Sequence, residues 1–368
     1  MYHTMVFTEL KYSYSYFYSH ALHIFSRNVF APYLAFEMAR NEIQKHFSRD
    51  VNPVYVGRER LPIDVSEDYH VIVEFKGEDS AGNFYCNVPD SLAEQILKYR
   101  MSFLTLDFDG DDNYNRAKVI DVVDDFPDAQ IFKTHRGYHV RVKFDVEKKF
   151  EELIELRKNY GEDYSRIRID MAYHKSGLTF LTNFLFNEKY WYEDGKIMQS
   201  IEQPVSITSI STVRTSFLSF KLPKTSFTLP RGTVEIDGDK AVFNGFFSKR
   251  DVERISRSIE DNLWEYSLTY DKALDLKERI FQAYRKINPL LAFIVQMSEV
   301  RFEGGKVILK VPKQHFRDIG RLIGKNGSVI KAVEQEVGVK ISIEHEGMQT
   351  PEEVILKKKL QTLLEKLI

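Results

Sequence analysis

The sequence lacks the features that mark secreted proteins, membrane-spanning proteins and proteins that coat nucleic acid by bulk charge. Its single cysteine, Cys86, excludes an internal disulfide and a cysteine-rich zinc site. No apolar run approaches the roughly 20 residues that span a bilayer, and the first residues, with Glu9 and Lys11 among tyrosines, do not resemble a secretory signal. The net charge is only −2. We therefore expect a cytoplasmic protein with no membrane partner.

The composition is that of an ordinary globular protein. It is 43% hydrophobic and 29% charged, and 368 residues suffice for two or three domains. The fold class is predicted as α/β (α+β). Charge is uneven along the chain, because residues 301–368 carry 13 Lys and Arg against 9 Asp and Glu. This basic excess indicates contact with nucleic acid at that end of the sequence.

Three segments alternate apolar with polar residues, the period of a half-buried strand. Each of them alone would be an ordinary strand with a charged outer face. Together they present carboxylates, a histidine and cations, which suit a divalent metal and a triphosphate. The polar faces of residues 103–109, 138–144 and 166–171 consist, in that order, of Asp107 and Asp109, of His139, Arg141 and Lys143, and of Arg166, Arg168 and Asp170.

The order and spacing of these segments resemble the three motifs of the archaeo-eukaryotic primase superfamily. The family motifs are a hydrophobic Asp-x-Asp, a Ser-Gly-x-Gly-x-His-like loop running into a strand, and a hydrophobic-Asp. Residues 175–189 also resemble the segment after the third motif in cellular primase small subunits and bacterial end-joining polymerases. The likeness covers about residues 10–235 and implies a primase-type core with mixed sheets and flanking helices. The corresponding residues here are Asp107-Phe108-Asp109, Thr134 to His139, and Ile169-Asp170.

The resemblance implies a role for each motif residue. Two metal ions, Mg²⁺ or Mn²⁺, would activate the attacking 3′-hydroxyl and stabilise the leaving pyrophosphate. Their expected ligands, also the catalytic residues, are Asp107, Asp109 and Asp170. The residues expected to bind the nucleoside triphosphate are Thr134, Arg136, Gly137, His139 and Lys189.

The chain departs from the family pattern in its second and third motifs. The second motif begins Thr134-His135 instead of Ser-Gly, and Thr182 or Asn183 stands where a cation often follows the third motif. About two dozen residues separate the first two motifs, too few for the zinc-binding insertion that cellular primase small subunits often carry. The chain therefore resembles compact members of the superfamily.

Two other interpretations concern the same acids. A calcium loop beginning at Asp107 is excluded, because Asp112 replaces its sixth-position glycine and Lys118 its final glutamate. Glu202, which precedes Gln203-Pro204, is an alternative third-motif acid and metal ligand. Asp170 is favoured over Glu202 because it lies in a strand-like pattern.

A second nucleic-acid motif lies near the C-terminus. Residues 319–330 contain a Gly-x-x-Gly turn, with a strand and a helix expected before it and a helix and a strand after it. This βααβ unit resembles the KH domain, whose turn clamps about four nucleotides of a single strand. Glycines allow close approach to phosphates, and the following helix offers its amides. The expected nucleic-acid-binding residues are Gly324, Lys325, Asn326 and Gly327.

The expected organisation is a primase-like catalytic domain (1–240), a helical connector (241–295) and a KH-like domain (296–368). Ser248 is the expected N-cap of a first connector helix, and Asn288-Pro289 should end a second one.

The predicted function is that of a DNA primase or primase-polymerase, a nucleotidyltransferase in DNA replication. It would act on a single-stranded DNA or RNA template or primer, with nucleoside triphosphates as substrates and replication proteins as possible partners. Two alternatives stay open: a catalytically degenerate nucleic-acid-binding factor, and a template-independent nucleotidyltransferase.

Overall fold

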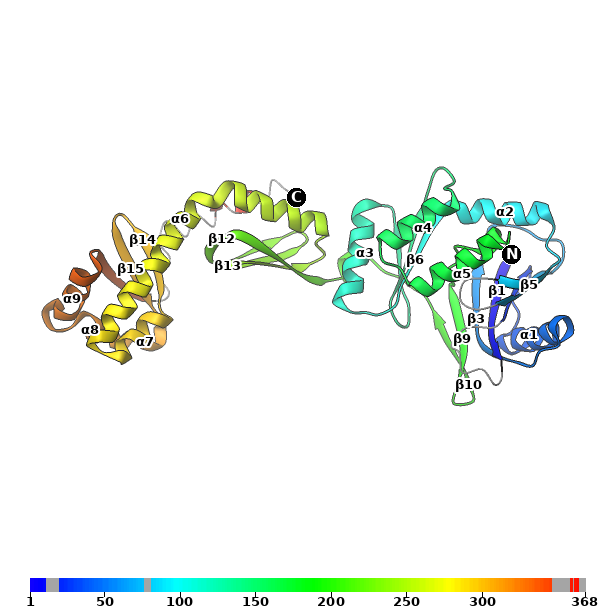
Figure 1. The fold of residues 1–368 in the computed structure, drawn as a ribbon, viewed down its shortest axis with the longest axis horizontal. Coiled ribbons are helices and arrows are strands. Elements are labelled where there is room, and N and C mark those ends of the chain that lie inside the picture. The colour runs from blue at the N-terminus through cyan, green and yellow to red at the C-terminus, as the bar shows by residue number, and fades with distance from the viewer. Residues whose placement is uncertain (11–19, 76–80, 346–357, 360, 364–368) are drawn as a thin grey trace. The chain divides into compact units, whose positions relative to one another are not determined.

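The computed structural model describes residues 1–10, 20–75, 81–345, 358–359 and 361–363. The chain forms two compact units, Met1–Ser211 and Thr212–Ile368 (Figure 1). The fold is mixed α/β, as predicted, with helices packed on several sheets. Within the described residues, no helix is both long and apolar enough to cross a membrane.

The larger sheet of the first unit is antiparallel, with seven strands in the order β10-β9-β3-β1-β2-β4-β5. Helix α1 (Pro32–Phe47) packs on one face, and α2 (Asp90–Met101) and α5 (Tyr164–Lys175) pack on the other. Met5 and Val6 of the central strand are both buried, on opposite faces. The strands are β1 (Tyr2–Leu10), β2 (His20–Ser26), β3 (Val51–Arg60), β4 (Tyr69–Phe75), β5 (Ala81–Cys86), β9 (Glu188–Glu193) and β10 (Lys196–Ile201).

The smaller sheet of the first unit carries the first two sequence motifs. It is antiparallel, in the order β11-β7-β8-β6. Helix α3 (Asn113–Asp125) contacts β8, and α4 (Phe150–Asn159) contacts β6. Short 3₁₀ helices η1 (Thr179–Leu181) and η2 (Ile207–Ser209) complete this unit. The strands are β6 (Phe103–Phe108), β7 (Gln130–Lys133), β8 (Tyr138–Lys143) and β11 (Gln203–Pro204).

Two of the three predicted motif strands are confirmed, and the third is wrong. Strands β6 and β8 match the predictions, with apolar residues buried and polar residues on the other face. Residues 166–171 instead belong to helix α5, which begins after Asp163, whose side chain accepts the Ser165 N–H. Ile167, Asp170 and Tyr173 are buried at helical spacing. Alternation over six residues did not distinguish a strand from this helix.

The second unit begins with a long hairpin, β12 (Thr212–Leu229) and β13 (Gly232–Gly245), which packs on the first half of α6 (Lys249–Ile287). The structural boundary therefore falls after Ser211, whereas the predicted first domain ends at residue 240. The reason is packing: hairpin residues such as Phe243 share a core with Ile255 of the helix.

The predicted connector is one helix of 39 residues followed by a short one, α7 (Pro289–Met297). Ser248 caps α6 with a capping box, as predicted, and Asn288 ends it before Pro289. The two helical runs expected within residues 248–287 are continuous, because no proline or glycine interrupts them.

The C-terminal part has the predicted KH-like core. Strands β14 and β15 pair antiparallel, and β15 and β16 pair parallel. This sheet shares a core with α7 and the second half of α6, so helix packing completes the small domain. The elements are β14 (Glu299–Glu303), β15 (Lys306–Val311), η3 (Lys313–Asp318), α8 (Ile319–Ile323), η4 (Lys325–Gly327), α9 (Ser328–Val337) and β16 (Lys340–His345).

Candidate functional site

The pairing of β6 with β8 brings the first two sequence motifs together. Asp107 and His139 are direct partners in the register of the two strands. Their side chains therefore share a face, and His139 Nε2 lies 3.5 Å from Asp107 Oδ1. Leu106 and Phe108 point the other way into the core. The polar face predicted for these two strands is thus formed.

Glu202 holds the far side of the His139 ring. Its Oε2 lies 2.9 Å from His139 Nδ1, and Arg141 donates to both of its oxygens, at 2.6 and 2.9 Å. Asn187 donates a further bond at 2.6 Å. Burial alone would raise the pKa of Glu202, but the hydrogen bonds from His139 and Arg141 hold it below its ordinary value. Glu202 is therefore an ionised, fully engaged carboxylate that orients His139.

Asp109 and two cations lie beside this pair. Loss of hydration and then the negative charge of Asp107 raise the pKa of Asp109, while Lys189 and Arg136 oppose that rise. The Lys189 side chain is exposed, and its Nζ lies 4.2 Å from the centroid of the Tyr55 ring. Loss of hydration lowers the pKa of Lys189, and the two aspartates oppose this. The first motif and both predicted cations therefore form one electrostatically coupled group.

The Thr134–Gly137 turn is held by its own hydrogen bonds. Gly137 N–H donates to Thr134 Oγ1 at 2.9 Å, and Thr134 N–H donates to Gly137 O at 3.0 Å. A Cβ on Gly137 would lie 1.9 Å from the Phe108 carbonyl oxygen, so only glycine fits against β6. Thr134 and Gly137 thus shape the loop and expose Arg136 at its tip. The sequence predicted nucleotide contact for both and missed this structural role.

Asp170 does not join the other two predicted aspartates. It lies on α5 instead of a strand, its side chain is 1% exposed, and its Oδ2 pairs with Arg157 Nη1 and accepts the Asn183 N–H at 3.0 Å. The predicted role as a metal ligand therefore needs correction, because this carboxylate balances a buried guanidinium. The cause is the helical backbone, which turns Asp170 into the core.

A network of buried ion pairs supports the strand that carries Asp107. Arg157 pairs with Glu162 and Asp170, and Glu162 also pairs with Arg166. Glu162 Oε1 accepts the backbone N–H of Asp107 at 3.2 Å. This fixes the end of β6, which carries the first motif. Sequence reasoning missed Glu162, which has no motif of its own.

Asp163 is a second residue that the sequence analysis missed. It is exposed, and its negative charge contributes to the raised pKa of Asp109. Its only sequence signal is that of a helix N-cap. Asp111, in contrast, is engaged by Arg116 at 2.6 Å and Lys133 at 2.8 Å.

The predicted metal ligands do not form a tight cluster. Among the described residues, one group of three His, Cys, Asp or Glu residues has its ligand atoms within 4.8 Å of one another, and it does not include Asp107 or Asp109. The two aspartates nevertheless offer carboxylate oxygens on one face, the ligands that Mg²⁺ prefers. They fit an ion that keeps several waters, without the third ligand expected from Asp170.

The turn between α8 and α9 has the backbone that its glycines permit. Gly324 and Gly327 have φ of 76° and 75°, and Asn326 between them has φ of 55°. A Cβ on Gly324 would lie 2.6 Å from Val329 Cγ2, so glycine is also needed for packing. Lys325 and Asn326 are exposed at the tip. All four predicted residues of this turn therefore lie together on the surface.

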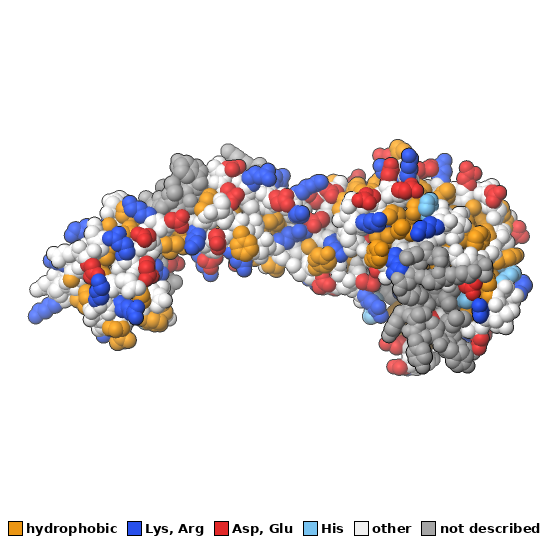
Figure 2. Space-filling model, viewed as in Figure 1, with side chains coloured by type: hydrophobic (Ala, Val, Ile, Leu, Met, Phe, Trp, Pro, Cys, Tyr) orange, Lys and Arg blue, Asp and Glu red, His pale blue; other side chains and the backbone are white. Residues whose placement is uncertain are grey.

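Basic side chains lie around the turn, and the helix before it is hydrogen-bonded to α6. Figure 2 shows several Lys and Arg side chains over the part formed by α8 and α9. Arg321 pairs with Asp318 at 3.1 Å, while Lys331 Nζ lies 3.5 Å from the Asn326 carbonyl oxygen. Tyr284 of α6 donates to the Leu322 carbonyl at 2.9 Å and so holds α8 to the long helix.

Comparison with known proteins identifies the C-terminal part. Residues 306–357 match the family model described as KH domain. The match agrees with the observed strand–helix–turn–helix–strand order, and it supports binding of single-stranded nucleic acid by this part. It does not extend to the first unit. No curated protein and no solved structure matches the chain.

Proposed function

We propose that this protein is a metal-dependent nucleotidyltransferase of the primase or primase-polymerase kind. It would extend a nucleic-acid 3′ end, or start a primer, on a single-stranded template. The observation that carries the proposal is the cross-strand pair of Asp107 and His139, with Asp109, Lys189 and Arg136 beside it. Acids, a histidine and nearby cations are the groups that nucleotidyl transfer requires.

The two aspartates would hold Mg²⁺ or Mn²⁺. The raised pKa of Asp109 reflects lost hydration first and repulsion from Asp107 second, and a cation bound by both carboxylates would relieve that repulsion. The bound ion would supply activation of the attacking hydroxyl and charge neutralisation on the leaving pyrophosphate. Asp163, which is exposed and whose charge acts on Asp109, is a further acid that could contribute an oxygen.

The cations would bind the triphosphate. Arg136 is exposed at the tip of the β7–β8 turn, and Lys189 lies over the Tyr55 ring within the electrostatic influence of the two aspartates. His139 has its Nδ1 occupied by Glu202, so its Nε2 faces the Asp107 side. A protonated ring could donate from Nε2 to a phosphate oxygen. Glu202 would act as a positioning residue for this contact.

The KH part would hold the template or primer strand. Its turn presents Lys325 and Asn326 to a phosphate backbone that can approach the two glycines closely. Because both parts belong to one chain, modest affinity of the KH turn would raise the local concentration of the strand at the catalytic unit. Replication proteins are the class of partner that such an activity would serve.

A second candidate is a nucleic-acid-binding factor that has lost catalysis. Two observations favour it: Asp170 is buried against Arg157, and Glu202 is held by Arg141 and His139. Neither acid is free to complete a metal site. A template-independent nucleotidyltransferase would use the same residues as the primase, and dependence on the template distinguishes these two.

The deciding experiment is nucleotide incorporation by the full chain. Labelled ribo- or deoxynucleotides and Mg²⁺ or Mn²⁺ are supplied with a single-stranded DNA or RNA template, with and without primer. We expect incorporation that needs both metal and template and is lost in an Asp107→Asn, Asp109→Asn double variant. Asp128→Asn, a change at an exposed turn aspartate, serves as the control. Equal incorporation by the double variant and the parent would refute the proposal.

The remaining outcomes separate the alternatives. Incorporation without template identifies the template-independent enzyme. Strand binding without incorporation under every condition identifies the non-catalytic factor.

A further inference from the structure

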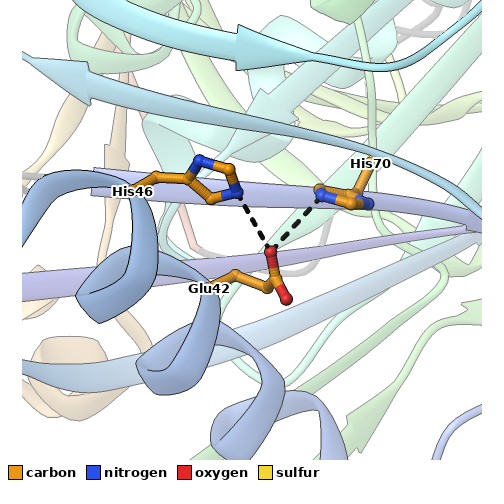
Figure 3. Close-up of side chains that lie close together, drawn as sticks. All are labelled: Glu42, His46 and His70. Atoms are coloured by element: carbon orange, nitrogen blue, oxygen red, sulfur yellow. Dashed lines mark ion pairs between the residues drawn. The ribbon is translucent and has the colours of Figure 1, made fainter.

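Three side chains of types that can ligate a metal lie together where α1 meets β4, and none of them belongs to the proposed nucleotide site. Glu42 and His46 lie one turn apart on α1, and His70 lies on β4 (Figure 3). Glu42 Oε2 is 3.4 Å from His46 Nε2 and 3.5 Å from His70 Nε2. Figure 3 shows both imidazole rings turned toward this one carboxylate oxygen.

The three facing atoms make ion-pair contacts with one another. Glu42 Oε2, His46 Nε2 and His70 Nε2 are each buried and have no hydrogen-bond partner among the residues that the structure describes. Their side chains remain 21–26% exposed, so solvent can reach the group. Lys45 Nζ, 3.8 Å from Glu42 Oε2, belongs to a side chain that is 67% exposed. Three buried polar atoms aimed at one point are what a bound cation would satisfy.

The donor set and its spacing indicate the kind of ion. Two imidazoles and one carboxylate are ligands of zinc sites that keep a fourth position open. Ligands about 2.0–2.1 Å from a tetrahedral ion are about 3.3 Å apart, close to the separations of Glu42 Oε2 from the two Nε2 atoms. Mg²⁺ prefers oxygen ligands and fits this set poorly.

The rings are held by neighbouring groups. The His46 ring stacks on Tyr85 with centroids 4.2 Å apart. The backbone N–H of His70 donates to Asn87 Oδ1 at 2.5 Å, and Asn87 Nδ2 lies 3.3 Å from His70 Nδ1. Ligation through Nε2 places the proton on Nδ1, where an acceptor strengthens metal binding. The amide nitrogen of Asn87 cannot accept a proton from Nδ1.

We propose that Glu42, His46 and His70 bind one Zn²⁺ ion, with water in the fourth position. The ion would link α1 to β4, on the face of the large sheet that α1 covers. The ligands differ from Asp107 and Asp109, so this site does not depend on the proposed nucleotidyl transfer.

The test is zinc binding by the chelator-treated full chain, measured by competition with a zinc indicator. We expect one zinc per chain and a higher melting temperature with zinc. Glu42→Gln, His46→Gln and His70→Gln should each weaken binding about tenfold or more. His174→Gln is the control, since His174 faces Glu151 at 3.4 Å elsewhere in the same unit. It should bind zinc like the parent.

A gain-of-affinity variant guards against loss of folding as the explanation. Asn87→Asp keeps the oxygen that accepts the His70 N–H and places a second acceptor near Nδ1. We expect it to bind zinc about tenfold or more tightly than the parent. The proposal is overturned if the parent binds no zinc, if Mg²⁺ competes equally, if the His174 control loses as much affinity as the ligand variants, or if Asn87→Asp brings no gain.

Discussion

His139 Nε2 lies 3.5 Å from Asp107 Oδ1, although 31 residues separate the two in the chain. The antiparallel register of β6 and β8 makes them direct partners. His139 is fixed from its other side by Glu202, 2.9 Å from Nδ1. The His139 imidazole therefore lies between Asp107 on the open face and Glu202, which is partly buried. Substitutions of His139 and Glu202 can test whether the orientation of this ring matters.

Replacing His139 should impair nucleotide binding more than strand binding. We expect His139→Ala to raise the KM for nucleotide about 10- to 150-fold, the loss of a charge-assisted hydrogen bond worth roughly 1.5–3 kcal/mol. Glu202→Gln, which keeps the shape but weakens the hold on Nδ1, should raise KM less. Steady-state kinetics at saturating template measures both. An unchanged KM together with earlier melting would make His139 a structural residue only.

Asp170→Asn should destabilise the first unit without abolishing nucleotide incorporation. Asp170 balances the fully buried Arg157, and loss of one partner of a buried pair costs roughly 3–5 kcal/mol. Thermal unfolding should therefore begin at lower temperature, while incorporation per folded molecule stays near the parental rate. Asp163→Asn on the same helix is the stability control, because asparagine also caps helices. If the variant has normal stability but no incorporation, Asp170 is a metal ligand after all.

The KH turn should control strand binding. Asn326 has φ of 55°, which aspartate tolerates, so Lys325→Asp with Asn326→Asp preserves the backbone and repels phosphate. We expect weaker binding of single strands, with the salt slope reduced by about 0.7 for each lost phosphate contact. Binding titrations at several salt concentrations measure this.

Lys224→Asp is the control for that charge reversal, at a side chain 75% exposed on the hairpin. It should leave strand affinity near that of the parent. If the turn variant also binds like the parent at every salt concentration, the KH part is a scaffold.

Stability should fall in mild acid because buried histidines of the large sheet are held neutral. Burial lowers the pKa of His20 from 6.5 to about 4, against the opposing charge of Glu74, and burial also lowers the pKa of His3 and His23. Below pH 6.5 the unfolded chain therefore binds more protons than the folded one. The His20 contribution is complete above pH 6.5 and is lost as the pH falls to about 4.

The loss attributable to His20 is about 3 kcal/mol, because burial lowers its pKa from 6.5 to about 4. Chemical unfolding between pH 7.5 and 4.5 measures it. His20→Gln should flatten the pH dependence, whereas His135→Gln, at an exposed position, should not. Identical pH profiles for the parent and His20→Gln would contradict the assignment.

Local sequence determined the elements whose signals are local. Alternation predicted β6 and β8, Ser248 marked the start of α6, and Asn288-Pro289 marked its end. The KH core was predictable because its glycine turn, helices and strands are contiguous. In each case the residues that decide the structure are close neighbours in the chain.

Tertiary structure decided which acids meet. Asp170 follows a strand-like pattern, yet Asp163 caps a helix there and Arg157 takes the carboxylate into the core. Glu202 reaches His139 because β11 pairs with β7, a contact between segments about 70 residues apart. Such contacts depend on long-range packing, which short motifs do not encode.

The cluster of Glu42, His46 and His70 also depends partly on local sequence and partly on packing. Glu42 and His46 are spaced for one face of a helix, which the sequence alone could have suggested. His70 joins them only because α1 packs over the large sheet beside β4. Sequence by itself thus determined the local elements and the donor types of this protein. The packing of helices on sheets decided which donors converge, because burial of apolar faces sets that geometry.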